Sequence, residues 1–269
     1  IADYGEHWQI ILHPERETSL KVRRRLKRLN DWGTTTVYPV LMYLLEQRAH
    51  GQAGASEIAR AMLILESYFV RRVLVGQGTM NMNHVLLSAP KAMERAKGDD
   101  ALDVVLRRYL SEAKPALATD DEVKSAILHA RFYGRGRAPQ RTLVRKWIDE
   151  SFGDDHVEHQ SKLTIEHIMP RNLNAAWRKE LKHGLKPGEN VAELHKELLD
   201  TLGNLTLLTQ EKNSGIGTRS FAKKKLDIKQ THLRMNAEIT RKVRWGPKQI
   251  RDRGHELAEI AVGIWPGPV

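Results

Sequence analysis

Glu166 and His167 stand side by side in a short β-branched run over 163–168, a pattern that predicts a strand, and Pro170 ends it. A neutral imidazole, with an unperturbed pKa of about 6.5, can activate a water molecule near neutral pH. A carboxylate and the amide oxygen of Asn213 suit Mg²⁺, which keeps several waters and binds substrate phosphate. Phosphodiester hydrolysis needs both an activated water and such a cation. The residues therefore predict a hydrolytic site with His167 as base and Glu166 and Asn213 as metal ligands.

A second short strand is predicted over 204–209 and is entered through Gly203. In a two-stranded hairpin, alternation places Glu166 and His167 on opposite sides, unless the first strand bends where they lie. We expect a bend before Pro170, because the residue before a proline is pushed away from helical backbone.

Each of these residues taken alone has an ordinary structural explanation. Asn204 follows Gly203, as a turn residue often does, and Asn213 could cap a helix. A glutamate beside a histidine in a strand also occurs by chance. It is their common order and spacing that favours the chemical interpretation.

The composition favours a polyanionic partner. Lysine and arginine total 44 against 33 acidic residues, which gives a formal net charge of +11 and a pI near 9.8. Nucleic acid is the commonest partner of such a chain, and a protein that is merely basic is the alternative. The absence of cysteine excludes disulfides and thiolate metal sites and permits a cytoplasmic place of action. The longest apolar run, 37–45, is far shorter than the ~20 residues of a membrane helix, so no membrane partner is expected.

Helical periodicity dominates the rest of the chain, so the predicted fold class is mainly α, with the two strands confined to the centre. A loop-like stretch over 114–121 suggests a division into a helical connector domain, 1–116, and a second domain, 117–269. Amphipathic helices are predicted over 21–29, 36–47, 56–72, 100–114, from residue 120 onward, 141–152 and 248–264.

Four short stretches together resemble a known family. They are Glu-His-Ile-Met-Pro at 166–170, Leu-Gly-Asn-Leu-Thr-Leu-Leu at 202–208, Asn213, and Ser-Phe-Ala-Lys-Lys-Lys at 220–225. Their order resembles the HNH nuclease domain at the C-terminus of GmrSD-type restriction endonucleases, a group that includes the SspE nucleases of phosphorothioate-linked phage defence. The likeness extends to 65–72 and to the C-terminal residues, so it covers most of the chain.

The resemblance implies a ββα-metal (His-Me finger, HNH) unit embedded in helices. It implies that His167 is the general base and that Asn204 fixes the loop and the orientation of the imidazole. Asn213 takes the place of the third motif residue, usually His or Asn, and would bind the metal with help from Glu166. The chain is therefore expected to carry a His-Asn-Asn variant of the motif.

Other polar residues leave alternatives open. His183 and His195, in the insert between the strands, could stand in for the third motif residue or could be surface histidines. The run Asp-Asp-His-Val-Glu-His at 154–159 could form a second metal cluster or a polar loop.

Basic side chains are expected to hold the backbone of a duplex. The turn over 131–137 mixes arginine, glycine and aromatic residues, which suits such contacts, although an ordinary glycine-rich turn has the same composition. The residues predicted to bind DNA are Arg135, Arg137, Arg171, Lys223 and Lys224.

The function that this resemblance implies is that of a metal-dependent DNA endonuclease, a nickase of a bacterial phage-defence (restriction) system. It would act on double-stranded DNA in the bacterial cytoplasm with Mg²⁺ or Mn²⁺. Family members usually carry an N-terminal ParB-like domain that hydrolyses nucleotide and senses modified DNA. No glycine-rich phosphate loop is present and the chain begins at Ile1, so we expect that this NTPase and sensor domain has been removed.

Two functions of other classes are the alternatives: a nucleic-acid-binding module with a degenerate nuclease site, and an RNA-directed toxin nuclease. One ββα site cuts one strand, so a double-strand break would need two events or two copies of the chain, that is, a homo-oligomer.

Contacts to the DNA backbone hold a protein on the duplex but do not distinguish one base sequence from another. Mapping the cut sites of this chain on a mixed-sequence plasmid should therefore show little base preference. A sharp consensus around the cut sites would contradict this prediction.

Overall fold

The computed structural model describes residues 2–96, 98, 100–153, 162–185 and 187–269. These residues are mainly helical and include two short strands, as the periodicity predicts. None of the described helices is both long enough and apolar enough to cross a membrane.

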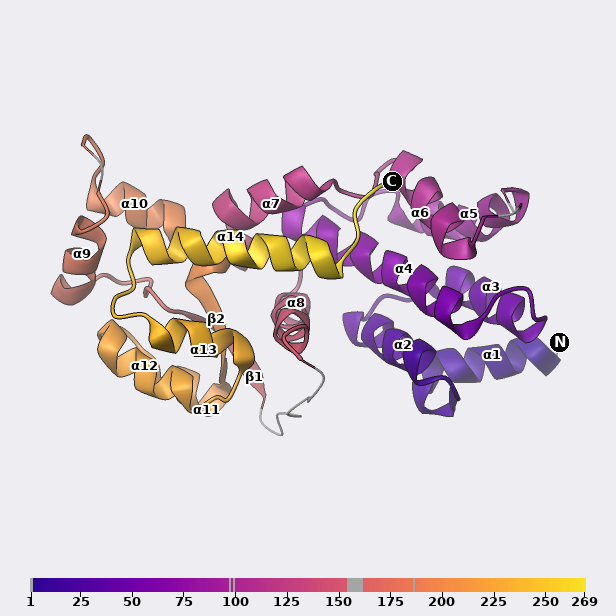
Figure 1. The fold of residues 1–269 in the computed structure, drawn as a ribbon, viewed down its shortest axis with the longest axis horizontal. Coiled ribbons are helices and arrows are strands. Elements are labelled where there is room, and N and C mark those ends of the chain that lie inside the picture. The colour runs from indigo at the N-terminus through magenta and orange to yellow at the C-terminus, as the bar shows by residue number, and fades with distance from the viewer. Residues whose placement is uncertain (1, 97, 99, 154–161, 186) are drawn as a thin grey trace. The chain divides into compact units, whose positions relative to one another are not determined.

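The chain forms two compact units (Figure 1). The first consists of Ile1–Val73, Gln77–Asp120 and Trp265–Val269, and the second of Leu74–Gly76 and Asp121–Ile264. The predicted boundary between residues 116 and 117 is a statement about two domains that would each fold alone. It stays a prediction.

The first unit is helical. Its helices are α1 (Ala2–Leu12), α2 (Leu20–Trp32), α3 (Tyr38–Ala49), α4 (Ala55–Val75), α5 (Met82–Arg95) and α6 (Leu102–Glu112). The helices predicted over 21–29, 36–47, 56–72 and 100–114 are confirmed within a few residues, whereas α1 and α5 lie outside the prediction. Helix α5 contains Pro90, a residue that ordinarily argues against a helix interior.

A buried carboxylate forms ion pairs with arginines of α2. Glu66 of α4 is 1% exposed and accepts hydrogen bonds from Arg25 and Arg28, both at 2.8 Å, and from the indole of Trp265 at 2.8 Å. An ion pair of this kind offsets the desolvation of the buried charge. Two arginines of the basic run in α2, Arg25 and Arg28, therefore form ion pairs with Glu66 within the first unit.

The second unit surrounds a two-stranded antiparallel sheet. Its strands are β1 (Leu163–His167) and β2 (Leu205–Thr209), which confirms both predicted strands within one residue. The remaining elements are α7 (Asp120–His129), η2 (Phe132–Gly134), α8 (Ala138–Glu150), α9 (Ala175–Lys182), α10 (Val191–Leu198), η3 (Leu202–Asn204), α11 (Gln210–Ile216), α12 (Phe221–Lys229), α13 (Arg234–Arg241) and α14 (Pro247–Ile264).

The register of the sheet pairs His167 with Leu205 and Leu163 with Thr209. Helices α9 and α10 form the connection between the strands, and α11 follows β2 directly and packs on both strands. Apolar side chains from β2 and the helices bury one core beside the sheet: Ile168, Trp177, Leu208, Phe221, Trp245 and Ile250 are central members.

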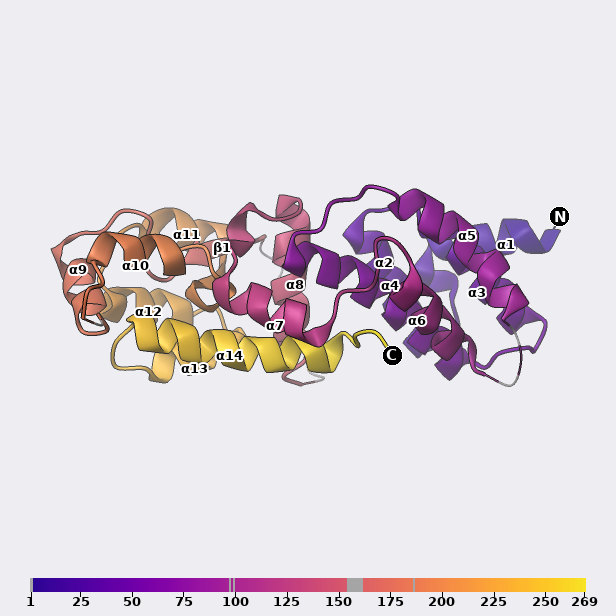
Figure 2. The same ribbon diagram turned by 90° about the horizontal axis from the view of Figure 1, so that it is seen from above.

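Helix α14 passes along the second unit and packs against η3, the turn that leads into β2. Figures 1 and 2 both show α7 beside it, and Lys124 of α7 forms an ion pair with Glu259 of α14 at 2.8 Å. The approach to η3 is close because Gly203 has no side chain: a Cβ there would lie 2.2 Å from the carbonyl oxygen of Ile250.

Gly203→Ala is therefore predicted to destabilise the protein by about 2 kcal/mol or more, because the clash is with backbone that cannot rotate away. Urea denaturation of the purified protein measures this. Gly263→Ala, on an open stretch of α14 where the added Cβ meets nothing within 4 Å, is the control and should be neutral or slightly stabilising. Equal stability of the two variants would show that η3 and α14 are not held in this close contact.

Candidate active site

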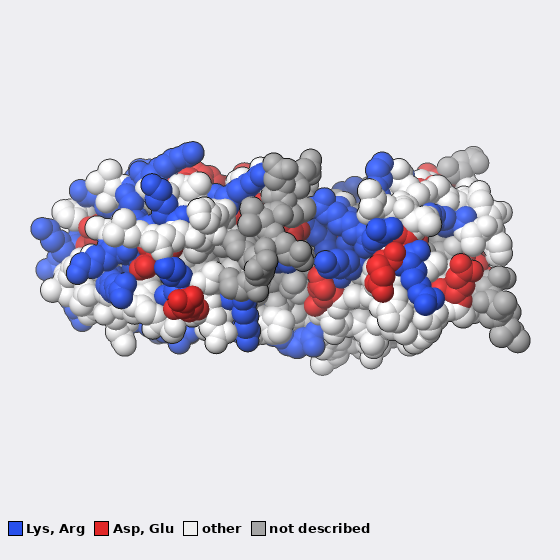
Figure 3. Space-filling view, turned by 90° about the horizontal axis from the view of Figure 1, so that it is seen from below, with Lys and Arg blue, Asp and Glu red and all other residues white. Residues whose placement is uncertain are grey.

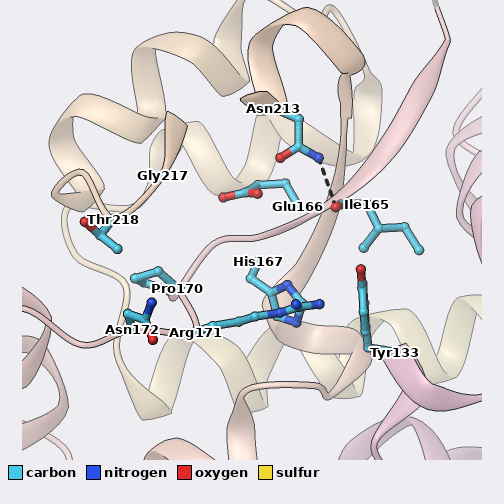
Figure 4. A pocket seen from close by; sticks show the side chains of 10 residues that line it. All are labelled: Tyr133, Ile165, Glu166, His167, Pro170, Arg171, Asn172, Asn213, Gly217 and Thr218. Carbon is cyan, nitrogen blue, oxygen red and sulfur yellow. Dashed lines mark hydrogen bonds between the residues drawn. The ribbon is translucent and has the colours of Figure 1, made fainter. Parts of the chain in front are cut away.

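A pocket of about 340 Å³ lies at the end of β1 (Figure 4). It is lined by Tyr133, 165–167, 170–172, Asn213 and 217–218. The pocket thus collects side chains from η2, β1, the loop after β1, and α11 with the loop that follows it. Among the predicted site residues, it brings together Glu166, His167, Asn213 and Arg171.

Glu166 and His167 leave β1 on opposite sides of the chain, as strand alternation predicts, yet both line the pocket. The strand ends at His167, and the chain bends at Ile168 and Met169 before Pro170. Because the pocket opens at the end of the strand, side chains from both of its faces reach it. The predicted bend is confirmed.

His167 is held by an acidic partner that the sequence analysis did not identify. Its Nε2 lies 2.9 Å from Oδ1 of Asp200, and both side chains are almost fully buried, at 8% and 9% exposure. The other oxygen of Asp200, Oδ2, accepts from Arg131 through Nε at 3.0 Å and Nη2 at 2.8 Å. Imidazole, carboxylate and guanidinium therefore form one hydrogen-bonded chain.

Burial lowers the pKa of His167 to about 4, against an ordinary value of 6.5. The hydrogen bond to Asp200 opposes this shift, while the charges of Arg171 and Arg145 add to it. For Asp200, burial acts to raise the pKa, but the bonds from His167 and Arg131 outweigh it and leave the pKa below its usual value. Near neutral pH the imidazole is therefore neutral and the carboxylate ionised, which is the state that a general base requires.

Glu166 forms a buried ion pair with Lys224. The Nζ of Lys224 donates to Oε1 of Glu166 at 2.6 Å and to the carbonyl oxygen of His167 at 2.8 Å. Burial raises the pKa of Glu166, against the opposing charge of Lys224, and burial also lowers the pKa of Lys224. The ammonium therefore clamps the end of β1 and fixes one oxygen of the carboxylate.

The expectation that Lys224 binds DNA is wrong for this conformation, because its side chain is 0% exposed. Lys224 lies on α12 with Phe221 and Ile228, at the spacing of one buried helix face. Its neighbour Lys223 is exposed and can still contact a duplex.

Asn213 of α11 is oriented by its amide nitrogen. Nδ2 donates to Oγ1 of Thr164 at 2.8 Å and to the carbonyl oxygen of Ile165 at 3.0 Å. Figure 4 shows the amide oxygen turned to the side on which the carboxylate of Glu166 lies. The two predicted ligand oxygens thus face the same part of the pocket.

Asn204 is fully buried and lies behind the pocket rather than in its lining. Its Oδ1 accepts from the backbone of Met169 at 2.8 Å and from the indole of Trp245 at 3.2 Å. Its Nδ2 donates to the carbonyl oxygens of Met169 at 3.0 Å and Leu199 at 2.8 Å. These bonds tie the bend after β1 to the start of β2, a geometry that accords with a loop-fixing role for Asn204.

Two buried arginines hold η3, the turn that carries Asn204. Arg145 of α8 donates to the carbonyl oxygens of Leu202 and Leu205, and Arg253 of α14 donates to those of Gly203 and Leu205. Both guanidiniums are almost completely buried, and burial lowers the pKa of both, that of Arg253 to about 10. They satisfy backbone carbonyls that would otherwise be buried without partners.

Tyr133 forms the wall of the pocket opposite Glu166. Its ring centroid lies 4.7 Å from that of His167, and the guanidinium of Arg171 lies over the same ring at 4.6 Å. Arg141 of α8 approaches the ring at 5.4 Å. Such cation–π contacts hold Arg171 in the pocket while leaving it exposed to solvent.

The other predicted DNA-binding residues lie on different parts of the second unit. Arg137 is exposed just before α8, whereas Arg135 is half-buried and donates to the carbonyl oxygen of Leu74, so much of its bonding capacity is used within the protein. The face of this unit that carries α12 shows many blue lysine and arginine side chains in the left half of Figure 3.

The oxygen donors of the pocket suit a magnesium site that is completed by water and substrate phosphate, and they do not suit a site in which protein side chains alone enclose the metal. The described residues contain no group of three or more His, Asp or Glu side chains that could enclose a metal. Glu166 and Asn213 do offer one carboxylate and one amide oxygen to the same pocket. Mg²⁺ in phosphoryl-transfer sites is bound in this way, through one or two protein oxygens together with water and substrate phosphate.

The remaining candidates do not join this site. His183 is exposed at the end of α9, and His195 of α10 bonds to the carbonyl oxygen of Pro170 at 2.9 Å without lining the pocket. The run 154–159 lies outside the described residues.

Sequence reasoning did not assign Asp200, Arg145 or Arg253 a role at this site. It placed Arg131 and Tyr133 only in a basic turn suited to DNA contacts, and not beside His167. Asp200 carried one available signal, since it is the one acidic residue in the mostly apolar stretch 198–209 that leads into β2. A buried acid needs a partner, so its position beside the Leu-Gly-Asn stretch predicts one nearby.

Comparison with known families gives one match. The model of the family described as GmrSD restriction endonucleases, C-terminal domain, matches residues 117–260, which is more than half of the 269 residues. A search of curated proteins finds no match.

The depressed pKa of His167 makes a prediction about stability. The unfolded chain binds a proton on this histidine below pH 6.5, whereas the folded protein resists protonation until about pH 4. Stability in EDTA should therefore fall by about 3 kcal/mol as the pH is lowered across that window, and His167→Gln should remove this part of the loss.

Urea denaturation at several pH values between 4 and 7 measures the effect. His183→Gln removes an exposed histidine and should keep the wild-type pH dependence. If His167→Gln kept it as well, burial would not be holding the imidazole of His167 neutral.

Proposed function

Since residues 117–260 place this chain in the family of the C-terminal domain of GmrSD restriction endonucleases, we propose that it is a metal-dependent DNA endonuclease of the HNH type that nicks DNA in bacterial phage defence. The observation that carries the proposal is the neutral, buried imidazole of His167 beside Glu166 and Asn213 in one pocket. Family membership supports the assignment as a restriction-type nuclease. The residues that line the pocket support hydrolysis by a general base together with a metal ion.

In the proposed reaction, His167 accepts a proton from water as the water oxygen attacks the phosphorus. The bond between phosphorus and the leaving oxygen breaks, and the leaving oxygen takes up a proton from solvent, so the phosphodiester becomes a phosphomonoester and an alcohol. His167 then releases its proton to solvent. Glu166 and Asn213 would hold Mg²⁺ or Mn²⁺ through their oxygens, and the bound ion would supply stabilisation of the charge that develops on the phosphate and the leaving oxygen.

Arg171 is the cation best placed to bind the reacting phosphate, because it lines the pocket and its exposed guanidinium is held on Tyr133. Lys223 and Arg137, both exposed, would contact the duplex farther away. In this proposal these cations contact phosphates of the DNA backbone, and such contacts carry no sequence information. The proposed substrate is therefore double-stranded DNA of any sequence.

Asn204 acts through the backbone in this proposal. Its four hydrogen bonds fix the bend at Met169, and through it the exit of Glu166 and His167 from β1. It does not line the pocket, so it is a positioning residue rather than one that contacts substrate.

Nicking of supercoiled plasmid in Mg²⁺ or Mn²⁺ tests the proposal. Wild-type protein should convert it to open circles, and His167→Ala should slow the conversion by about 10²–10⁴-fold, the usual contribution of a general base. His183→Ala, which removes a histidine outside the pocket, should cut like the wild type.

Equal rates for the wild type and His167→Ala would overturn the role of His167. Tight DNA binding without cleavage by any of the proteins would favour a binding module instead. Cleavage of RNA but not DNA would point to an RNA-directed nuclease.

A further inference from the structure

Asp200 bonds to His167, and Arg131 bonds to Asp200, yet neither residue is accounted for by the reaction described above. We propose that Asp200, oriented by Arg131, holds His167 in the tautomer that carries its proton on Nε2, so that Nδ1 is the atom that accepts the proton from water. This proposal rests on the proposed nuclease function for its catalytic meaning, but not for the tautomer itself.

The contact between His167 and Asp200 is direct. A neutral imidazole has one N–H donor and one acceptor nitrogen, and an ionised carboxylate can only accept. Nε2 lies 2.9 Å from Oδ1 of Asp200, so the shared proton must belong to Nε2. Nδ1 then carries the lone pair.

Arg131 fixes which oxygen of Asp200 meets the imidazole. Its Nε and Nη2 both donate to Oδ2, at 3.0 and 2.8 Å, which leaves Oδ1 for His167. Asp200 is almost fully buried, while the Arg131 side chain is 69% exposed. The guanidinium therefore reaches in from the surface to hold an internal carboxylate.

The turn that carries Arg131 also supports the imidazole from a second direction. The backbone N–H of Tyr133 donates to the carbonyl oxygen of Asp200 at 3.3 Å, and the Tyr133 ring packs on His167. The same short turn thus sets the position of Asp200, the orientation of its carboxylate and one face of the imidazole.

Asp200→Asn separates a specific role from mere packing, because the substitution keeps shape and removes charge. With two donors from Arg131 at the Oδ2 position, the amide oxygen should take that place and its NH₂ should face His167. The imidazole must then accept at Nε2, so its proton moves to Nδ1 and the base is lost. The corresponding change in a serine protease lowers kcat by about 10⁴-fold through the wrong tautomer.

We expect Asp200→Asn to lower kcat for plasmid nicking by at least about 100-fold, with a KM within a few-fold of the wild type. The double variant Arg131→Met with Asp200→Asn should cut faster than Asp200→Asn alone, because the freed amide can turn its oxygen toward Nε2. Asp103→Asn is the matched control: Asp103 also forms a two-point pair with Arg60, in the first unit, and this variant should cut like the wild type.

A ¹⁵N NMR measurement in EDTA tests the tautomer without any cleavage. The chain has 12 histidines, and the signals of His167 are identified by their loss in His167→Gln. The wild type should show the proton on Nε2 of His167, Asp200→Asn should show it on Nδ1, and Asp103→Asn should match the wild type.

A wild-type proton on Nδ1, an unchanged tautomer in Asp200→Asn, or a double variant that cuts no faster than Asp200→Asn would overturn the proposal. If Asp200→Asn did not fold, the wild-type tautomer would still decide it, and Arg131→Met alone should retain the proton on Nε2. The expected tautomers in a protein that cuts no plasmid would contradict the nuclease function and leave the role of Asp200 standing.

Discussion

The second unit depends on how it satisfies the backbone of η3, a buried turn that cannot reach water. The carbonyl groups of Leu202, Gly203 and Leu205 accept hydrogen bonds from two buried guanidiniums, and that of Asn204 accepts from the backbone of Ile168. A buried carbonyl without a donor costs about 1–3 kcal/mol, so this turn could not be buried without such donors. Helices α8 and α14 supply them, which explains why a small sheet is enclosed by so much helix.

The η3 turn also connects the surrounding helices to the residues of the pocket. Its buried asparagine fixes the bend after β1, and the bend sends Glu166 and His167 from opposite faces of a strand into one pocket. Opposite charges are paired at this pocket: Lys224 binds Glu166, and Arg131 binds Asp200, which also bonds to the neutral imidazole of His167. Burial then favours the neutral form of the imidazole, because the charged form would have to be desolvated.

Sequence reasoning located the parts of the site that are encoded locally. The two strands, the bend before Pro170 and the pocket residues 165–167 follow from β-branched runs and turn residues that are adjacent in the chain. Family resemblance supplied the role of Asn204 and the place of Asn213 as the third residue of the motif.

What it missed depends on contacts between distant elements. Arg131 and Asp200 are separated by 69 positions and meet only when η2 packs beside the approach to β2. At Lys224 the local sequence pattern itself led to a wrong prediction. A run of lysines indicates an exposed basic helix, but the 3.6-residue period places the middle lysine on the same buried face as Phe221 and Ile228. Helical spacing therefore outweighs composition in such a run.

Chemical rescue tests the central claim, that the imidazole of His167 is the base of a hydrolytic site. His167→Gly leaves a space beside Glu166 and Tyr133 that free imidazole can enter. The account predicts that His167→Gly nicks supercoiled plasmid in Mg²⁺ or Mn²⁺ about 10²–10⁴-fold more slowly than the wild type, and that imidazole in the buffer raises the rate in proportion to its concentration. Nicking by His167→Gly at the wild-type rate without imidazole would contradict it, and so would a variant that no concentration of imidazole restores.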